Sequence, residues 1–191
     1  MDSQVDLIVH WMRVGFIHGV LNTDNVTLSG ESIDYGPCAF MDSFDPDTVF
    51  SSIDHQGRYA YGNQPTITQW NLSRFAETLL PMIDENVDSA IEKATAIIKS
   101  FSERYSEKWL AMMKKKLGLF GDDPVDEKLI TDLLEWMKVN QADYTNTFRD
   151  ITGEHFPAGG FYQDDAFINW HQRWQARLGR NSKPLLSLIH I

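Results

Sequence analysis

The chain has 191 residues, of which 42% are apolar, so it is long enough to bury a hydrophobic core. Its 27 acidic and 17 basic residues leave a net charge of −10, which argues against nucleic acid as a partner. The single cysteine, Cys38, excludes an internal disulfide framework, and neither an apolar run of ~20 residues nor a signal-peptide pattern occurs, so we expect a cytoplasmic protein with no membrane partner.

The first expected element is a helix over residues 5–17, which carries apolar residues on more than one side. A loop over residues 18–25 follows, and then two β-prone triplets, 26–28 and 32–34, flank a glycine turn. This arrangement predicts a small β-hairpin. Residues 35–65 are rich in Gly, Pro, Asp, Ser and aromatic side chains, and an irregular segment of that length is typical of a functional loop.

The remainder of the chain is predicted to be helical. Apolar residues at helical spacing mark separate helices around 72–80, 87–101 and 105–113, and Pro81 is expected to end or kink the first. Asp123-Pro124 predicts the N-cap and first-turn proline of a fourth helix. The last helix follows the stripe Phe167, Trp170, Trp174 and Leu178, and the Met and Trp stripes are expected in the core.

Both ends of the chain look cut. The first helix is apolar on several sides and expects packing partners upstream of Met1. Residues 179–191 carry no periodicity, so we expect a non-native or unstructured tail there, and a single folded region over residues 1–178. The fold class predicted from these patterns is mainly α with a small β-hairpin.

The residues that indicate chemistry lie around the predicted hairpin. His18 opens a loop that ends in Asp24 and Asn25, and Asp34-Tyr35-Gly36 follows the second β-prone triplet. Protein kinases use this layout, in which a histidine, a catalytic aspartate and a metal-binding asparagine precede a second metal-binding aspartate. A hairpin would bring Asn25 and Asp34 together, and their oxygen atoms are the ligands that Mg²⁺ or Mn²⁺ prefers.

One position departs from the usual kinase layout. Small-molecule kinases carry a base two residues after the histidine, but Val20 occupies that position here. Asp24 is the nearest carboxylate that could accept a proton, and it is adjacent to the proposed metal ligand Asn25. The pattern therefore indicates that a nucleotide is bound but attacked in a different way. His18 is expected to brace the loop.

At this point the sequence resembles a known family. The string His-Gly-Val-Leu-Asn-Thr-Asp-Asn at 18–25 and Ile-Asp-Tyr-Gly-Pro at 33–37 are similar to the signature of the selenoprotein O (SelO/YdiU) family. Asp-Ser-Phe-Asp-Pro at 42–46 and Tyr-Gly-Asn-Gln-Pro at 61–65 also match it. In weaker form, the resemblance extends to about Leu178.

The resemblance implies a kinase-like fold, of which this chain is the carboxyl-terminal lobe. Proteins of this family bind ATP in a flipped orientation and transfer AMP to Ser, Thr or Tyr hydroxyls of proteins. Carried over by motif position, Asp24 is the proton acceptor, Asn25 and Asp34 bind Mg²⁺, and Asp34 also lies near ATP. The phosphate-binding lysine and arginines of the family would lie upstream of Met1, so we expect this chain to be inactive by itself.

Two other functions stay open from the sequence. The first is an ordinary phosphotransferase that moves the γ-phosphate, against which Val20 argues. The second is a catalytically dead kinase-like module that only binds partners through residues 35–65. The protein substrate and the oligomeric state have no motif that would identify them.

Overall fold

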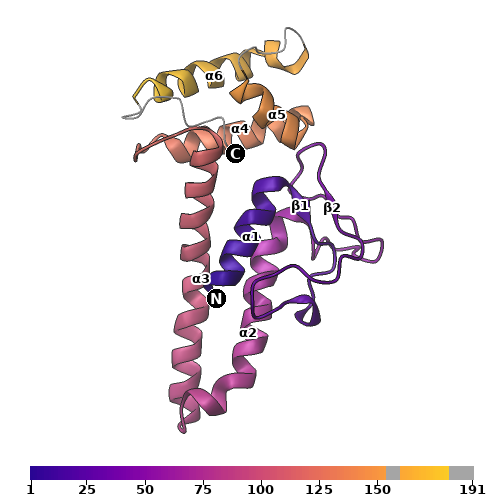
Figure 1. Cartoon of the computed structure of the whole chain (residues 1–191), viewed down its shortest axis with the longest axis vertical. Coiled ribbons are helices and arrows are strands. Elements are labelled where there is room, and N and C mark those ends of the chain that lie inside the picture. The colour runs from indigo at the N-terminus through magenta and orange to yellow at the C-terminus, as the bar shows by residue number, and fades with distance from the viewer. Residues whose placement is uncertain (154–159, 181–191) are drawn as a thin grey trace. The chain divides into compact units, whose positions relative to one another are not determined.

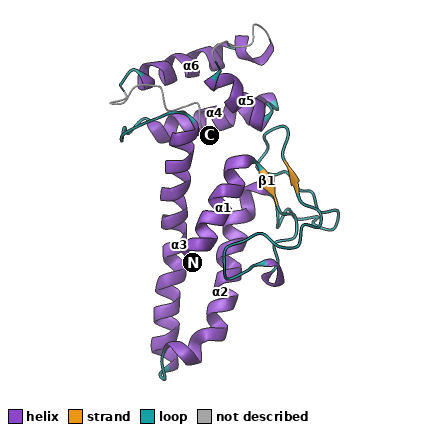
Figure 2. Cartoon of the chain, viewed as in Figure 1, coloured by secondary structure: helices purple, strands orange, loops and turns teal. Residues whose placement is uncertain are grey.

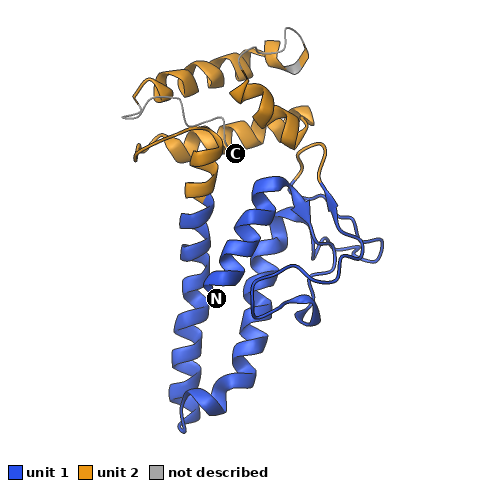
Figure 3. Ribbon diagram, in the orientation of Figure 1, with its two compact units in different colours: residues 1–40, 46–109 blue, residues 41–45, 110–191 orange. Residues whose placement is uncertain are grey.

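The computed structural model describes residues 1–153 and 160–180, and it is mainly helical with one small antiparallel sheet (Figures 1 and 2). The chain divides into two compact units (Figure 3): unit 1 holds residues 1–40 and 46–109, and unit 2 holds residues 41–45 and 110–191. The elements are, in chain order, α1 (Asp2–Val14), β1 (Phe16–Ile17), β2 (Ala39–Phe40), α2 (Gln64–Ile83), α3 (Val87–Lys116), α4 (Asp126–Asn140), α5 (Tyr144–Thr152) and α6 (Asp165–Leu178).

Unit 1 is built on α1, α2 and most of α3. The buried face of α1 includes Val5 and Ile8, neither of which is exposed to solvent. α1 ends three residues earlier than predicted because Gly15 adopts a left-handed conformation with a φ of 71° and caps the helix. Arg104 on α3 pairs with Asp2 on α1 at 2.8 Å. Irregular backbone follows β1 and gathers beside α1 and α2 (Figure 2).

The two-stranded sheet is not the hairpin that the sequence predicted. β1 pairs with β2, with Phe16 opposite Phe40, so the sheet joins a segment predicted to be helical and a segment predicted to be a loop. At the predicted hairpin, the described residues form one antiparallel bridge, between Val26 and Ser32. The turn is therefore present, but its two arms separate after a single pair.

The break predicted between residues 101 and 105 is absent, and the helix predicted to start around residue 72 begins earlier. The helices expected around 87–101 and 105–113 are one helix of 30 residues, α3, because the sequence between them contains no residue that breaks a helix. α2 begins at Gln64 with Pro65 in its first turn, and it continues through Pro81 for two residues. Pro81 therefore lies in the last turn of α2, close to the point where the helix ends.

Unit 2 packs α4, α5 and α6 around aromatic residues. Trp170 and Trp174 on α6 are buried, as predicted, and their indole nitrogens donate hydrogen bonds to the carbonyl oxygens of Leu129 and Leu117. Met137 is also fully buried. The sequence patterns did not predict α5, whose N-cap carboxylate, Asp143, accepts a hydrogen bond from the backbone of Asn146 at 2.6 Å.

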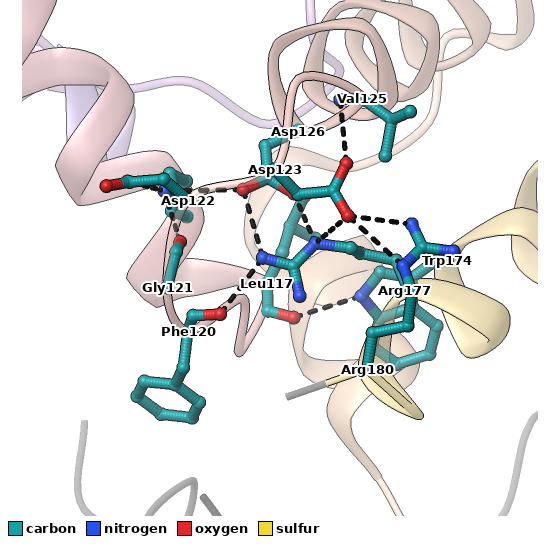
Figure 4. Close-up of polar contacts among 11 residues, drawn as sticks. Leu117, Phe120, Gly121, Asp122, Asp123, Val125, Asp126, Trp174, Arg177 and Arg180 are labelled. Carbon is teal, nitrogen blue, oxygen red and sulfur yellow. Dashed lines mark hydrogen bonds and ion pairs between the residues drawn. The ribbon is translucent and has the colours of Figure 1, made fainter. Parts of the chain in front are cut away.

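A buried ion pair joins α6 to the start of α4 (Figure 4). Arg177 and Asp126 are each 2% exposed, and the guanidinium contacts both carboxylate oxygens, at 2.6 and 3.1 Å. Arg177 also donates to the carbonyl oxygen of Phe120 at 3.0 Å. The prediction that Asp123 is the N-cap of α4 was wrong, because the helix begins at Asp126. The Asp123 carboxylate accepts a hydrogen bond from the backbone nitrogen of Val125.

No helix among the described residues is both long and apolar enough to cross a membrane. The predicted tail, residues 179–191, falls mostly outside the described residues, which end at Arg180. The boundary at residue 178 therefore stays a prediction.

Candidate functional site

His18 sits at the centre of the loop that carries the candidate site residues. Its side chain is completely buried, and its Nε2 atom lies 2.8 Å from the carbonyl oxygen of Ile33. The backbone nitrogen of His18 donates to the side-chain oxygen of Gln64, on the first turn of α2, at 3.0 Å. His18 therefore braces the loop, as expected, by linking it both to the segment before Asp34 and to α2.

Two residues in this region have backbone conformations with positive φ. Gly19 has a φ of 82°, and a Cβ atom there would lie 2.9 Å from Cγ of Pro37, so this position requires glycine. Asp34 has a φ of 55°, which is uncommon for a residue other than glycine, although aspartate tolerates it better than most. The backbone nitrogen of Gly36 donates to the carbonyl oxygen of Asp34 at 2.8 Å. These contacts join the loop of Gly19 to the segment from Asp34 to Pro37.

α1 holds the turn that separates Asn25 from Asp34. The side-chain nitrogen of Gln4 donates to the carbonyl oxygen of Thr27, and the indole nitrogen of Trp11 donates to the Ser32 hydroxyl at 2.9 Å. A Cβ atom on Gly30 would lie 2.7 Å from Cβ of Ser3, so the turn packs closely on the start of α1. Both arms of the turn are therefore attached to the same helix.

Each of the three predicted site residues has a side-chain oxygen atom with no hydrogen-bond partner among the described residues. The Asn25 amide nitrogen donates to the carbonyl oxygen of Val20 at 2.8 Å, which orients the amide and assigns its oxygen as the atom available to a ligand. Asp24 and Asp34 are exposed, and neither carboxylate makes a hydrogen bond or ion pair within residues 1–153 and 160–180. Three oxygen-bearing groups thus remain available on a loop that is otherwise well hydrogen-bonded.

One antiparallel bridge, between Val26 and Ser32, joins the two arms of the turn. The pairing does not continue to the predicted site residues, because Thr23–Asn25 form a short 3-10 helix and Asp34 has a φ of 55°. In the described part of the chain, no cluster of three or more His, Cys, Asp and Glu residues is arranged to hold a metal ion. The predicted metal site contains only two such residues, Asp24 and Asp34, and its third member, Asn25, is not of these types. The search therefore does not test the predicted site, which stays a prediction.

Sequence reasoning missed the residues of α2 that support this loop. Besides accepting from His18, the Gln64 amide donates to the carbonyl oxygen of Phe16 at 3.0 Å, and it is almost completely buried. Asn71, further along α2, donates to the carbonyl oxygen of Leu21 at 3.0 Å. Gln64 and Asn71 lie on the same buried face of α2 as Ile67. Buried amides need hydrogen-bond partners, so two amides on an apolar helix face are the sequence signal that a loop docks there.

Comparison with known proteins identifies the family. Residues 1–183 match the family model described as protein adenylyltransferase SelO. The chain is 74% identical over 189 residues to protein nucleotidyltransferase YdiU of Alcanivorax borkumensis, covering 99% of this chain and 39% of that protein. It is 58% identical to the YdiU protein of Nitrosococcus oceani, covering 99% of this chain and 38% of the relative. The chain thus spans less than two fifths of the length of these relatives. It belongs to the SelO family.

Proposed function

We propose that the full-length protein containing this chain is a protein adenylyltransferase, which transfers AMP from ATP to Ser, Thr or Tyr hydroxyls of other proteins. The observation that carries this proposal is a pair of unpartnered carboxylates, Asp24 and Asp34, on either side of one turn that also carries the oriented amide of Asn25. Membership of the SelO family supports it. We infer that this chain forms the carboxyl-terminal lobe of a kinase-like fold, and that the protein is cytoplasmic.

In this proposal Asp24 accepts the proton of the attacking hydroxyl. The hydroxyl oxygen forms a bond to the α-phosphorus of ATP, the bond from that phosphorus to the bridging oxygen breaks, and pyrophosphate leaves. Asp24 is suited to this role because its carboxylate is exposed and no described side chain occupies it. The loop contacts of His18 and Asn25 hold the backbone on either side of it in place.

Asn25 and Asp34 would hold the magnesium or manganese ion that accompanies ATP. One amide oxygen and one carboxylate form a hard-oxygen donor set, which fits these ions and leaves positions for phosphate oxygens and water. When bound, the ion neutralises the charge that develops on the phosphates. The left-handed backbone of Asp34 fits a role as ligand, since strained conformations concentrate at functional sites.

A labelling experiment with the full-length protein tests this function. If the proposal is right, label from the α-phosphate of ATP appears on a protein target and label from the γ-phosphate does not. The reverse result would identify a phosphotransferase and contradict the proposal. The chain of 191 residues alone should transfer neither label, because the residues expected to contact ATP phosphates lie outside it.

A binding-only module is the other candidate, because segment 35–65, which is irregular apart from β2, one short 3-10 helix and the start of α2, is long enough to contact a partner. Thermal unfolding of the full-length protein with and without Mg-ATP separates the two. An adenylyltransferase is stabilised by its bound nucleotide, whereas a module without a nucleotide site is not.

A further inference from the structure

The backbone around Arg58 is held by several hydrogen bonds. The backbone nitrogens of Arg58 and Tyr59 donate to the two carboxylate oxygens of Asp54, at 2.8 and 2.7 Å. The preceding Gly57 has a φ of 67°, and its carbonyl oxygen accepts from the Asn63 side chain at 2.6 Å. These contacts fix the backbone from which the Arg58 side chain projects, so this side chain loses less entropy when it binds a ligand.

The Arg58 guanidinium stacks on an exposed tryptophan. Its central carbon lies 4.6 Å from the ring centroid of Trp70, which is 41% exposed. Arg74 also lies over this ring, at 5.5 Å, but it is paired with Glu77. The Arg58 guanidinium, by contrast, makes no ion pair or hydrogen bond with any described side chain.

This stacking leaves the arginine ready for an anionic partner. A guanidinium that lies over an aromatic ring uses its flat face, so its N–H donors still point outward in the plane of the group. Those donors match the two oxygens of a carboxylate.

Arg58 is connected to the loop of Asp24 through Tyr59. The Tyr59 ring, which is 5.8 Å from the Arg58 guanidinium, bears a hydroxyl that donates to the side-chain oxygen of Asn22. Asn22 precedes Asp24 by two residues, a separation of at most about 7 Å along the chain. Arg58 and Asp24 therefore stand on segments that are in contact, and a peptide with its hydroxyl at Asp24 can extend along these segments to Arg58.

We propose that Arg58, supported by Trp70, binds an acidic side chain of the protein substrate next to the hydroxyl that is modified. The inference rests on the proposed function, and it names the substrate class of the same site: hydroxyl-bearing segments flanked by Asp or Glu. Arg58 acts as a substrate-binding residue and takes no part in the chemical step.

Two fluorescent peptides test this inference with the full-length protein. Each has one tyrosine, flanked on both sides by glutamates in the first peptide and by glutamines in the second. Their dissociation constants, from fluorescence anisotropy, and their KM and kcat for AMP transfer are measured for the wild type, Arg58→Gln and Arg58→Lys. Lys99→Gln is the matched control, because Lys99 is an exposed cation of α3 in the same unit.

The wild type should bind the glutamate peptide more tightly. Arg58→Gln should weaken that binding about two- to fivefold, the size expected for one exposed charged pair, and raise KM without lowering kcat. Binding of the glutamine peptide should not change, Arg58→Lys should restore part of the preference, and Lys99→Gln should match the wild type.

Three results would overturn the inference: no glutamate preference in the wild type, a preference that survives in Arg58→Gln, or a loss in Arg58→Gln that is equal for both peptides. Loss of stabilisation by Mg-ATP in Arg58→Gln would also overturn it, because the arginine would then serve the nucleotide. The two proposals fail separately. If the wild type transfers no AMP but its anisotropy preference depends on Arg58, the adenylyltransferase function is wrong and the acidic-substrate site stands.

Discussion

Two places in the molecule, one in each unit, use aspartate in opposite ways. In unit 1, Asp24 and Asp34 are exposed and have no partner among the described residues, on a loop braced by the hydrogen bonds of His18 and Asn25. In unit 2, Asp126 is buried and paired with Arg177 through two contacts (Figure 4). Asp126 is thus part of the framework of unit 2, whereas Asp24 and Asp34 are available to a ligand.

The difference shows how partners separate structural from functional acids. A charged carboxylate is buried at tolerable cost only when a cation and hydrogen bonds compensate for lost water, which Arg177 supplies to Asp126. An exposed carboxylate without a partner adds little to folding. Its place on a braced loop, within a family of nucleotidyltransferases, fits the role that we propose for it.

The largest expected effect concerns the unpartnered acids. Asp34→Asn in the full-length protein keeps the shape of the side chain, and asparagine tolerates the left-handed backbone, but the charge that would hold the metal ion is lost. AMP transfer should fall by about 10⁴-fold, with little change in the thermal midpoint. A transfer assay with α-labelled ATP measures this, and Asp88→Asn, an exposed acid of α3, serves as the control. Full activity in Asp34→Asn would remove this residue from the site.

The buried acid of unit 2 should behave in the opposite way. Asp126→Ala removes the nearer carboxylate from the buried Arg177 guanidinium and leaves only Asp123, at 3.6 Å, which should lower the free energy of unfolding by about 3 kcal/mol. Urea denaturation followed by tryptophan fluorescence measures the loss, because Trp174 is hydrogen-bonded to Leu117 beside this ion pair. The double variant Asp126→Leu/Arg177→Met should recover much of it. A loss below about 1 kcal/mol in Asp126→Ala would contradict this expectation, because it would mean that water replaces the lost contacts of the Arg177 guanidinium.

A glycine substitution tests how strongly the loop of unit 1 is held. Gly19→Ala adds a methyl group 2.9 Å from Pro37 and strains a φ of 82°, so stability should fall by about 2 to 3 kcal/mol. Gly121→Ala is a matched control, with a φ of 75° but no atom within 4 Å of the added carbon. It should cost only about 1 kcal/mol. Equal losses by thermal unfolding would show that the contact with Pro37 is unimportant.

The smallest expected effect is a pH dependence at the rim of the ion pair of unit 2. The hydrogen bond from Lys114 lowers the pKa of Asp122 below its ordinary value of 3.8, and the same bond raises the pKa of Lys114 above 10.5. The pair therefore stabilises the fold between these values, and its contribution is lost as the pH falls below 3.8 or rises above 10.5.

Comparing Asp122→Asn with the wild type isolates this contribution. The difference in thermal midpoint should be small and constant from pH 5 to pH 9, which lies about one unit or more inside both values. It should disappear in acid below the pKa of Asp122. A difference that grew in acid would contradict this assignment, because the protonated aspartate would then be the form that stabilises the fold.

Part of the fold could be predicted from the sequence because it depends on local patterns. The Trp and Met stripes predicted buried helix faces, and Trp170, Trp174 and Met137 are indeed buried. The boundaries were less predictable. α1 ends early because of Gly15, and α3 is continuous because nothing between 101 and 105 interrupts it. The pairing of β1 with β2 joins residues more than twenty positions apart, which no short pattern encodes.

The sequence by itself determined the family and the identity of the candidate site residues, because Asp24, Asn25 and Asp34 belong to motifs with fixed spacing. Only the tertiary structure decided how the loop is supported. The buried amides of Gln64 and Asn71, the burial of His18 and the stacking of Arg58 on Trp70 all depend on α2 packing against segments distant in the sequence. A side chain's type can be read from the sequence, but whether it has a partner depends on which distant segments the fold brings beside it.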